Sequence, residues 1–151
     1  MLINKIISSA EYPNQLKMAI VRPIYKRDGD KTNKDNFRPI SIFPIMNKIV
    51  ETSILTRLDN FFAQNNLYDS NQFAFRKSSG TDLAITELMH HVNQALDKKK
   101  MIGIVFVDVK KAYDAINHDV LIEKLEASGV RGHALNLIKS YLSNRQQAIR
   151  I

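Results

Sequence analysis

The spacing of apolar residues along the chain predicts alternating strands and helices, and therefore an α+β fold. Strands are expected at residues 17–25, 37–43, 102–107 and 146–151, and helices at residues 45–64, 81–98, 117–128 and 130–142. The first two strands flank a polar, charged segment, which is typical of an antiparallel hairpin with a long tip. Pro23 favours an edge position in the first strand, because proline cannot donate a hydrogen bond to a strand ladder.

The most apolar stretch, residues 102–107, is followed by a carboxylate. Its Val and Ile residues, interrupted only by Gly103, predict a strand that is covered on both faces. Asp108 comes next, and a carboxylate at the end of a buried strand is costly unless a hydrogen-bonded turn or a metal ion satisfies it. Tyr113 lies five residues further on, beside the small Ala112. The pattern fits either a core strand that ends in a polar turn or a metal-binding site.

Two loops combine positive charge with features that suit phosphates or bases. The hairpin tip and its return strand carry Lys26, Arg27, Lys31, Lys34 and Arg38. Such cations either face solvent or clamp phosphates, for which arginine offers a bidentate fork and lysine a point charge. In residues 72–81, Phe73 and Phe75 are interleaved with basic residues, so they either pack beneath the loop or stack on bases. Thr81 is expected to cap the helix that follows.

The composition fits a single soluble domain. The 151 residues are 44% apolar and 25% charged, and no apolar run is long enough to cross a bilayer. The net charge of +7 is consistent with a polyanionic partner, although charge alone identifies none. The absence of cysteine excludes disulfides and cysteine-ligated zinc, and it fits an intracellular protein, either nuclear or cytoplasmic.

The segment FVDVKKAYDAINHDVL, residues 106–121, resembles the first palm motif of reverse transcriptases, especially those of non-LTR (LINE-type) retrotransposons. The earlier segments IVRPIYKRDGD and NFRPIS resemble the fingers hairpin of the same family. The resemblance covers residues 17–151 in the family's order. It implies a right-hand polymerase arrangement of antiparallel strands and packed helices, with a lead-in at residues 1–16, fingers at 17–101 and a truncated palm at 102–151.

The resemblance also implies a role for each candidate site residue. Asp108 is the implied catalytic residue and Mg²⁺ ligand, assisted by the backbone carbonyl of Val109. Nucleotide binding is implied for Lys26, Arg38, Ala112 and Tyr113, and template binding for Gln72, Phe75 and Arg76. Lys26 and Arg38 are expected beside the triphosphate, and Tyr113 beneath the sugar, where it excludes a 2′-hydroxyl. The implied partners are an RNA template, a DNA primer and dNTPs, with no membrane.

Two departures from the family pattern bear on activity. Ala74 stands where the family has glycine, and alanine would be strained if that position required a positive φ. The complete family enzyme holds two Mg²⁺ ions with further carboxylates from a Tyr-X-Asp-Asp hairpin, and this sequence contains no Asp-Asp pair. We therefore expect the remaining palm and the thumb to be missing, and the chain not to polymerise alone. It is interpreted as a fragment of an RNA-directed DNA polymerase, with an inactive remnant that at most binds nucleic acid, or an inert relic, as alternatives.

Overall fold

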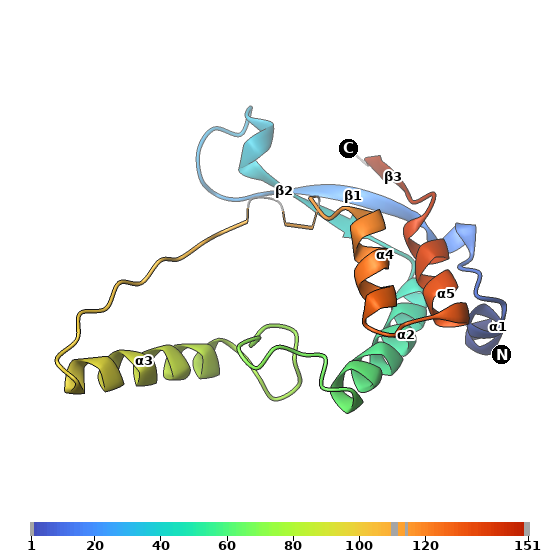
Figure 1. The fold of residues 1–151 in the computed structure, drawn as a ribbon. Helices are drawn as coiled ribbons and strands as arrows, with labels where there is room; N and C mark the ends of the chain where they lie inside the picture. Colours follow the sequence, from blue (N-terminus) through green and yellow to red (C-terminus); the bar gives the residue numbers. More distant parts are fainter. Residues whose placement is uncertain (1, 110–111, 114, 150–151) are drawn as a thin grey trace. The chain divides into compact units, whose positions relative to one another are not determined.

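The protein has an α+β architecture, as predicted, in a computed structural model that describes residues 2–109, 112–113 and 115–149. The helices are α1 (Leu2–Ser9), α2 (Ile45–Gln64), α3 (Thr81–Asp97), α4 (His118–Ala127) and α5 (Gly132–Leu142), with short 3₁₀ turns η1 (Asn14–Leu16) and η2 (Lys34–Asn36). The strands are β1 (Met18–Tyr25), β2 (Phe37–Ile42) and β3 (Gln146–Ile149) (Figure 1). No helix in this described part of the chain is both long and apolar enough to span a membrane.

The chain divides into two compact units. The first, called here the discontinuous unit, combines residues 1–60 with residues 116–151. The second, called the inserted unit, consists of residues 61–115. The hairpin belongs to the discontinuous unit, and α3 belongs to the inserted unit.

The sheet has three strands in the order β2-β1-β3. β1 and β2 pair antiparallel, with Tyr25 opposite Phe37 next to the tip, which confirms the predicted hairpin. β3 pairs with β1 in parallel, so the expectation of antiparallel strands is wrong for β3. The long connection from β1 to β3, which includes helices, allows β3 to return in the same direction as β1. The pairing between β1 and β3 ends at Val21, which lies opposite Ile149. Among the described residues, Pro23 therefore has no partner in β3.

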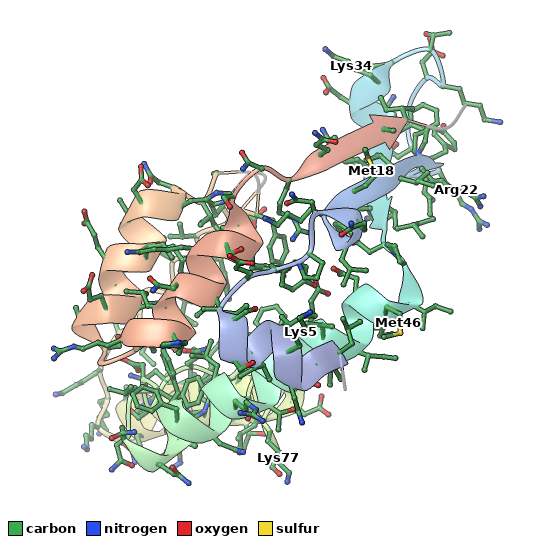
Figure 2. The ribbon with its side chains drawn as sticks, turned by 90° about the vertical axis from the view of Figure 1, so that its right-hand side faces the viewer. Lys5, Met18, Arg22, Lys34, Met46 and Lys77 are labelled. Atoms are coloured by element: carbon green, nitrogen blue, oxygen red, sulfur yellow. The ribbon has the colours of Figure 1, made fainter. Side chains whose placement is uncertain are left out.

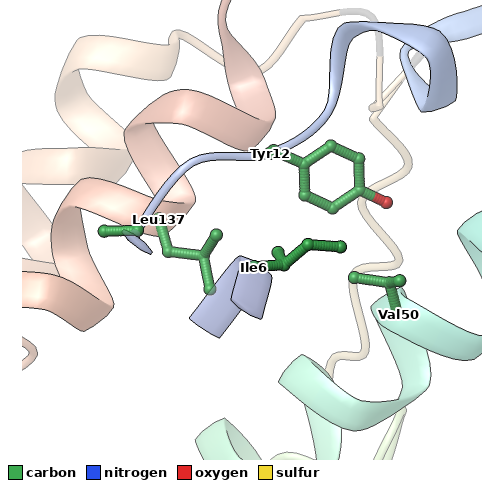
Figure 3. Close-up of a cluster of buried hydrophobic side chains, with 5 residues drawn as sticks. Ile6, Tyr12, Val50 and Leu137 are labelled. Carbon is green, nitrogen blue, oxygen red and sulfur yellow. The ribbon is translucent and has the colours of Figure 1, made fainter. Parts of the chain in front are cut away.

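A small apolar core lies within the discontinuous unit. Ile6, Tyr12, Val50 and Leu137 converge there from α1, the segment after it, α2 and α5 (Figure 3). Val50 has no exposed surface, and Asn47, almost one turn earlier on α2, is also fully buried. The buried face of α2 is narrower than its sequence predicts, because only this short stretch of the helix is fully covered. Exposed members of the predicted apolar stripe are Ile45, Met46, Ile49 and Leu55.

Polar contacts surround this core. The Tyr12 hydroxyl donates a hydrogen bond to Asn47 Oδ1 at 2.6 Å, and the Tyr141 hydroxyl donates to Glu51 Oε1 at 2.7 Å. The two tyrosine rings meet edge to face, with their centroids 5.0 Å apart. The guanidinium carbon of Arg145 lies 4.5 Å from the centroid of the Tyr141 ring, in a cation–π contact. These contacts join α2, α5 and the segment that leads into β3.

Alkaline pH is expected to weaken this core. Burial, followed by the charge of Glu51, raises the pKa of Tyr12 to about 12, and burial also raises the pKa of Tyr141. The unfolded chain releases these protons near pH 10, roughly the ordinary tyrosine pKa, whereas the folded chain retains them. The contribution of these two tyrosines to the free energy of unfolding should therefore be fully present below about pH 10 and should decline as the pH rises from about 10 towards 12.

Denaturant unfolding at a series of pH values measures this alkaline decline. Tyr12→Phe removes one of the two titrating groups and should make the decline shallower. A decline of the same steepness in wild type and Tyr12→Phe would show that Tyr12 does not cause it.

Local capping defines both ends of α4. Asn117 Oδ1 accepts hydrogen bonds from the backbone N–H groups of Asp119 at 2.9 Å and Val120 at 3.2 Å, which confirms the predicted N-cap. Gly129 follows the helix with a φ of 95°, a conformation that glycine adopts without strain. The predicted termination of the helix at this glycine is therefore also confirmed.

The inserted unit is much more exposed than the discontinuous unit. None of its described residues is buried, so the apolar stripe predicted on α3 has no complete cover there. The prediction that Thr81 caps α3 is wrong, because Thr81 is already the first residue of the helix. Gly80 is the N-cap instead, and its carbonyl accepts a hydrogen bond from the Ala84 backbone N–H at 3.1 Å.

The prediction of a strand at residues 102–107 is also wrong. This segment has neither strand nor helix structure, and Val105, Phe106 and Val107 are 84–85% exposed. A strand needs partners for its backbone N–H and C=O groups, and the sheet formed by the described residues does not include this segment. Apolar composition alone therefore does not make these residues a strand.

Candidate functional site

The tip between β1 and β2 is shaped by its own side chains. The Tyr25 hydroxyl donates a hydrogen bond to the Gly29 carbonyl, and the Asn36 side chain donates to the Asp30 carbonyl at 2.8 Å. The Asp30 carboxylate accepts a hydrogen bond from the Thr32 backbone N–H at 2.9 Å, and this bond lowers the pKa of Asp30. The tip is thus ordered by polar contacts, although most of it is exposed.

The implied triphosphate ligands lie on this hairpin. Lys26 follows β1, and its Nζ donates a hydrogen bond to the Asp35 carbonyl at 2.7 Å. Arg38 lies on β2 opposite Ile24, and its side chain is exposed. Lys34 lies at the outer end of the same hairpin (Figure 2). The structure therefore places several exposed cations on one ordered element of the discontinuous unit.

Gly29→Ala is expected to disorder the tip. Gly29 has a φ of +73°, and an added Cβ would lie 2.5 Å from Asn36 Nδ2. The substitution should cost about 1–3 kcal/mol of local stability, because it strains the backbone and displaces the Asn36 side chain from its hydrogen bond. Faster hydrogen exchange of the Lys26 amide, which donates to the Asn36 carbonyl at 2.8 Å, would report this change.

The control for this prediction is Gly80→Ala. Gly80 has extended backbone, and nothing lies within 4 Å of an added Cβ. This variant should leave the exchange of the Lys26 amide unchanged. Unaltered exchange in Gly29→Ala as well would show that the contact between Gly29 and Asn36 does not order the tip.

The residues implied in metal and sugar binding lie in exposed chain of the inserted unit. Asp108 and Ala112 are exposed, and Val109 and Tyr113 are 63% and 78% exposed. The neighbouring Lys110, Lys111 and Asp114 lie outside the described residues. Among the residues that are described, no three His, Cys, Asp or Glu side chains gather to hold a metal. Asp108 thus offers one carboxylate, which suits a Mg²⁺ ion that arrives with phosphate ligands but does not make a two-ion site.

The loop before α3 contains the residues implied in template binding. Arg76 Nη1 donates hydrogen bonds to the carbonyls of Asp69 at 2.9 Å and Gln72 at 3.3 Å, and the guanidinium lies 5.2 Å from the centroid of the Tyr68 ring. Arg76 therefore organises the loop itself. Phe75 is 87% exposed, so it does not pack beneath the loop and presents its ring to solvent.

Ala74 does not have the positive φ that would strain an alanine. The positive φ in this part of the loop, 59°, falls on Phe75 and not on Ala74. The Ala74 carbonyl accepts a hydrogen bond from Gln72 Nε2 at 3.2 Å. Alanine is therefore compatible with the local backbone, and the left-handed conformation lies at the next residue, Phe75.

Sequence reasoning missed the residues that shape the hairpin tip. Tyr25, Gly29 and Asn36 form its internal contacts, yet only the flanking cations stand out as candidate ligands. The Asp-Gly-Asp sequence at residues 28–30 signals a tight turn, and it could have identified Gly29. The contact between Asn36 and Asp30 joins residues six positions apart, for which the sequence contains no comparable signal.

Comparison with known families identifies the chain. The profile of the family described as "Reverse transcriptase (RNA-dependent DNA polymerase)" matches residues 24–151. The chain belongs to the reverse transcriptase family. The matched region of this reverse transcriptase chain includes the β1–β2 tip, the loop before α3 and Asp108.

Similar curated proteins come from mobile elements. The chain is 30% identical over 151 residues to the "Probable RNA-directed DNA polymerase from transposon BS" of Drosophila melanogaster, an alignment that covers 100% of the chain and 17% of that protein. It is 27% identical over 149 residues to the RNA-directed DNA polymerase from mobile element jockey of Drosophila funebris, covering 99% and 16% of the two. It is 26% identical over 125 residues to the Retrovirus-related Pol polyprotein from type-1 retrotransposable element R2 of Popillia japonica, covering 83% and 17%.

These relatives confirm the resemblance to reverse transcriptases of non-LTR retrotransposons. The chain spans only 16–17% of the length of these relatives.

Proposed function

We propose that this reverse transcriptase chain supplies the nucleotide-holding hairpin and the first metal-binding carboxylate of an RNA-directed DNA polymerase. Residues 17–101 form its fingers and residues 102–151 the first part of its palm, after a lead-in at residues 1–16. The polymerase transfers a dNMP from a dNTP to the 3′ end of a DNA primer on an RNA template. The complete enzyme also requires the rest of the palm and the thumb.

The ordered hairpin is the observation that carries this proposal. Its tip is held by hydrogen bonds, so Lys26 and Arg38 are presented from defined positions before a ligand binds. Among the described residues, neither forms an ion pair with a carboxylate. An arginine fork and a lysine ammonium suit the oxygens of a triphosphate, and pre-organised groups lose little entropy on binding.

Each candidate residue has one task in this proposal. Lys26 and Arg38 hold the triphosphate. Asp108 and the backbone carbonyl of Val109 bind Mg²⁺, and Ala112 and Tyr113 lie against the sugar. The residues that border the template are Gln72, Phe75 and Arg76. Magnesium, when bound, supplies positive charge for the reacting phosphate. Phe75 is the exposed ring on which a base can stack, whereas Arg76 shapes the loop that presents it.

Titration of the chain with dTTP in the presence of Mg²⁺ tests the role of the hairpin. Arg38→Gln should weaken dTTP binding about tenfold, because it removes a charged hydrogen-bonding partner. Arg57→Gln removes the same charge from an exposed position on α2, and it is the matched control. Equal affinity of Arg38→Gln and Arg57→Gln for dTTP would show that the hairpin does not hold the triphosphate.

A second candidate function is nucleic-acid binding without polymerisation by this chain alone. It is favoured because, among the described residues, no group of three His, Cys, Asp or Glu side chains that could hold a metal includes Asp108. The purified chain should therefore give no primer extension with Mg²⁺ and dNTPs. Extension that disappears in Asp108→Asn would exclude this candidate.

A further inference from the structure

Residues 101–109 form an exposed, mostly apolar segment of the inserted unit. They have neither helix nor strand structure, and no backbone hydrogen bond joins them to the other described residues (Figure 1). Most of them are β-branched and Phe106 is aromatic, and these residue types favour strands. The segment therefore has the composition of a strand, while its backbone groups and apolar side chains are open to a partner strand.

The two ends of this segment carry opposite charges. Lys100 precedes it and Asp108 lies near its end, and residues 101–107 between them are uncharged. Both charged side chains are exposed, and neither forms an ion pair among the described residues. If two copies run antiparallel with Ile104 opposite Ile104, Lys100 of each copy lies opposite Asp108 of the other, and every position between them faces an apolar residue or glycine.

The same charges disfavour a parallel arrangement. In a parallel pair with matching residues side by side, Lys100 would lie beside Lys100 and Asp108 beside Asp108, and like charges at neighbouring positions are destabilising. The segment is therefore complementary to itself in one direction only. This complementarity identifies a second copy of the chain as the partner that the segment fits.

The inserted unit also offers apolar surface that can cover such a pair. The antiparallel register puts Ile102, Ile104 and Phe106 on one face, between the two ion pairs, because alternate residues of a strand share a face. A ribbon of two strands alone is only marginally stable in water, so this face needs a cover. The apolar side chains of α3 that are 47–59% exposed and available for it are Leu83, Ile85, Met89 and Leu96.

We propose that residues 100–108 pair antiparallel with the same residues of a second copy of this chain, centred on Ile104. The dimer has twofold symmetry, so each contact in it occurs twice. Pairing gives partners to backbone groups that the single chain leaves to water, and it removes exposed apolar side chains from water. Because Asp108 faces Lys100 of the other copy, the dimer is a state of the chain without Mg²⁺ at this carboxylate.

Single cysteines can map this register, because the chain has no cysteine of its own. Ile104→Cys should give a disulfide-linked dimer under mild oxidation, since directly opposite Cβ atoms lie about 4.5–5.5 Å apart, near the separation that a disulfide bridges. Val107→Cys is the matched control, because it lies opposite Met101 and roughly 20 Å from Val107 of the other copy. Val107 is 85% exposed and Ile104 47%, so random collisions would favour the control.

Sedimentation velocity at several protein concentrations, at low salt and without Mg²⁺, tests the ion pairs. Lys100→Asp and Asp108→Lys should each weaken self-association about tenfold, because both opposite-charge pairs become like-charge pairs. An equimolar mixture of the two variants should associate as wild type does, since each mixed dimer regains both pairs. Lys99→Asp makes the same charge change opposite Val109, so it should weaken association less than about threefold.

Three results would overturn the inference. The first is a wild-type chain that remains monomeric at every concentration. The second is equal cross-linking of Ile104→Cys and Val107→Cys, which would indicate a parallel or unspecific association. The third is a mixture of Lys100→Asp and Asp108→Lys that associates no better than either variant alone. All the substituted side chains are exposed, so each variant should retain the circular dichroism spectrum of the wild-type chain.

Discussion

Asp108→Asn is expected to lower nucleotide incorporation at least about a thousandfold in a longer reverse transcriptase that contains this chain, because a metal-binding carboxylate supports several kcal/mol of transition-state stabilisation. Asparagine keeps the size of the side chain but removes the negative charge that a Mg²⁺ ion requires. Asp108 is exposed, so the substitution should not disturb folding. Single-turnover primer extension on an RNA template measures the effect.

The matched control for Asp108→Asn is Asp119→Asn. Asp119 is also an exposed carboxylate of the matched region, but it lies in the first turn of α4. This variant should extend primers within a few fold of wild type. Comparable losses in the two variants would mean that Asp108 has no special part in the chemistry.

Val50→Asp is expected to unfold the discontinuous unit. Val50 has no exposed surface and packs with Ile6 and Leu137 in the core. A carboxylate there would lose its hydration without gaining a partner, a cost of about 4 kcal/mol or more and comparable to the whole stability of a small domain. Loss of the cooperative transition in thermal or urea unfolding is the expected result.

Leu55→Asp is the control for the core substitution. Leu55 lies on the same helix but is 63% exposed, so the new carboxylate would remain hydrated. This substitution should change the free energy of unfolding by less than about 1 kcal/mol. If Leu55→Asp were as damaging as Val50→Asp, the core would be larger than the contacts around Val50 show.

Elements with strong local signals are predictable from the sequence. α2 begins and ends as predicted, because its apolar spacing continues without interruption from Ile45 to Gln64. Asn117 caps α4 through bonds to residues two and three positions away. The hairpin is recognisable because two short apolar segments flank a turn-rich, charged tip. Each of these features depends mainly on contacts between neighbours in sequence or across one turn.

Features that depend on distant partners are predicted less well. Residues 102–107 have the composition of a buried strand, but their structure depends on a neighbouring strand that the described sheet does not contain. The parallel pairing of β3 with β1 joins segments more than a hundred residues apart. The contact between Tyr141 and Glu51 is also long-range, and neither helix sequence indicates it. Hydrophobic pattern identifies a face that can be buried and leaves its partner undetermined.

The residues of the candidate site also differ in how well the sequence predicts them. Lys26 and Arg38 are singled out by the resemblance to the fingers hairpin of the family, and the structure places both on or next to the strands of that hairpin. The residues that hold the tip in shape act through side-chain contacts and are absent from the sequence-based set. Strand alternation and register place Arg22 on the same face of the hairpin as Arg38, although Arg22 is not in the sequence-based set.

Whether the hairpin holds the triphosphate can be decided by locating the bound nucleotide residue by residue. Backbone amide NMR spectra of the chain, recorded with increasing dTTP and Mg²⁺, would show which resonances move. Saturable shifts concentrated between Ile24 and Arg38 are expected, with a smaller response to thymidine, which lacks the triphosphate. Shifts confined to residues outside the hairpin, or equal responses to dTTP and thymidine, would contradict the claim that this hairpin holds the triphosphate.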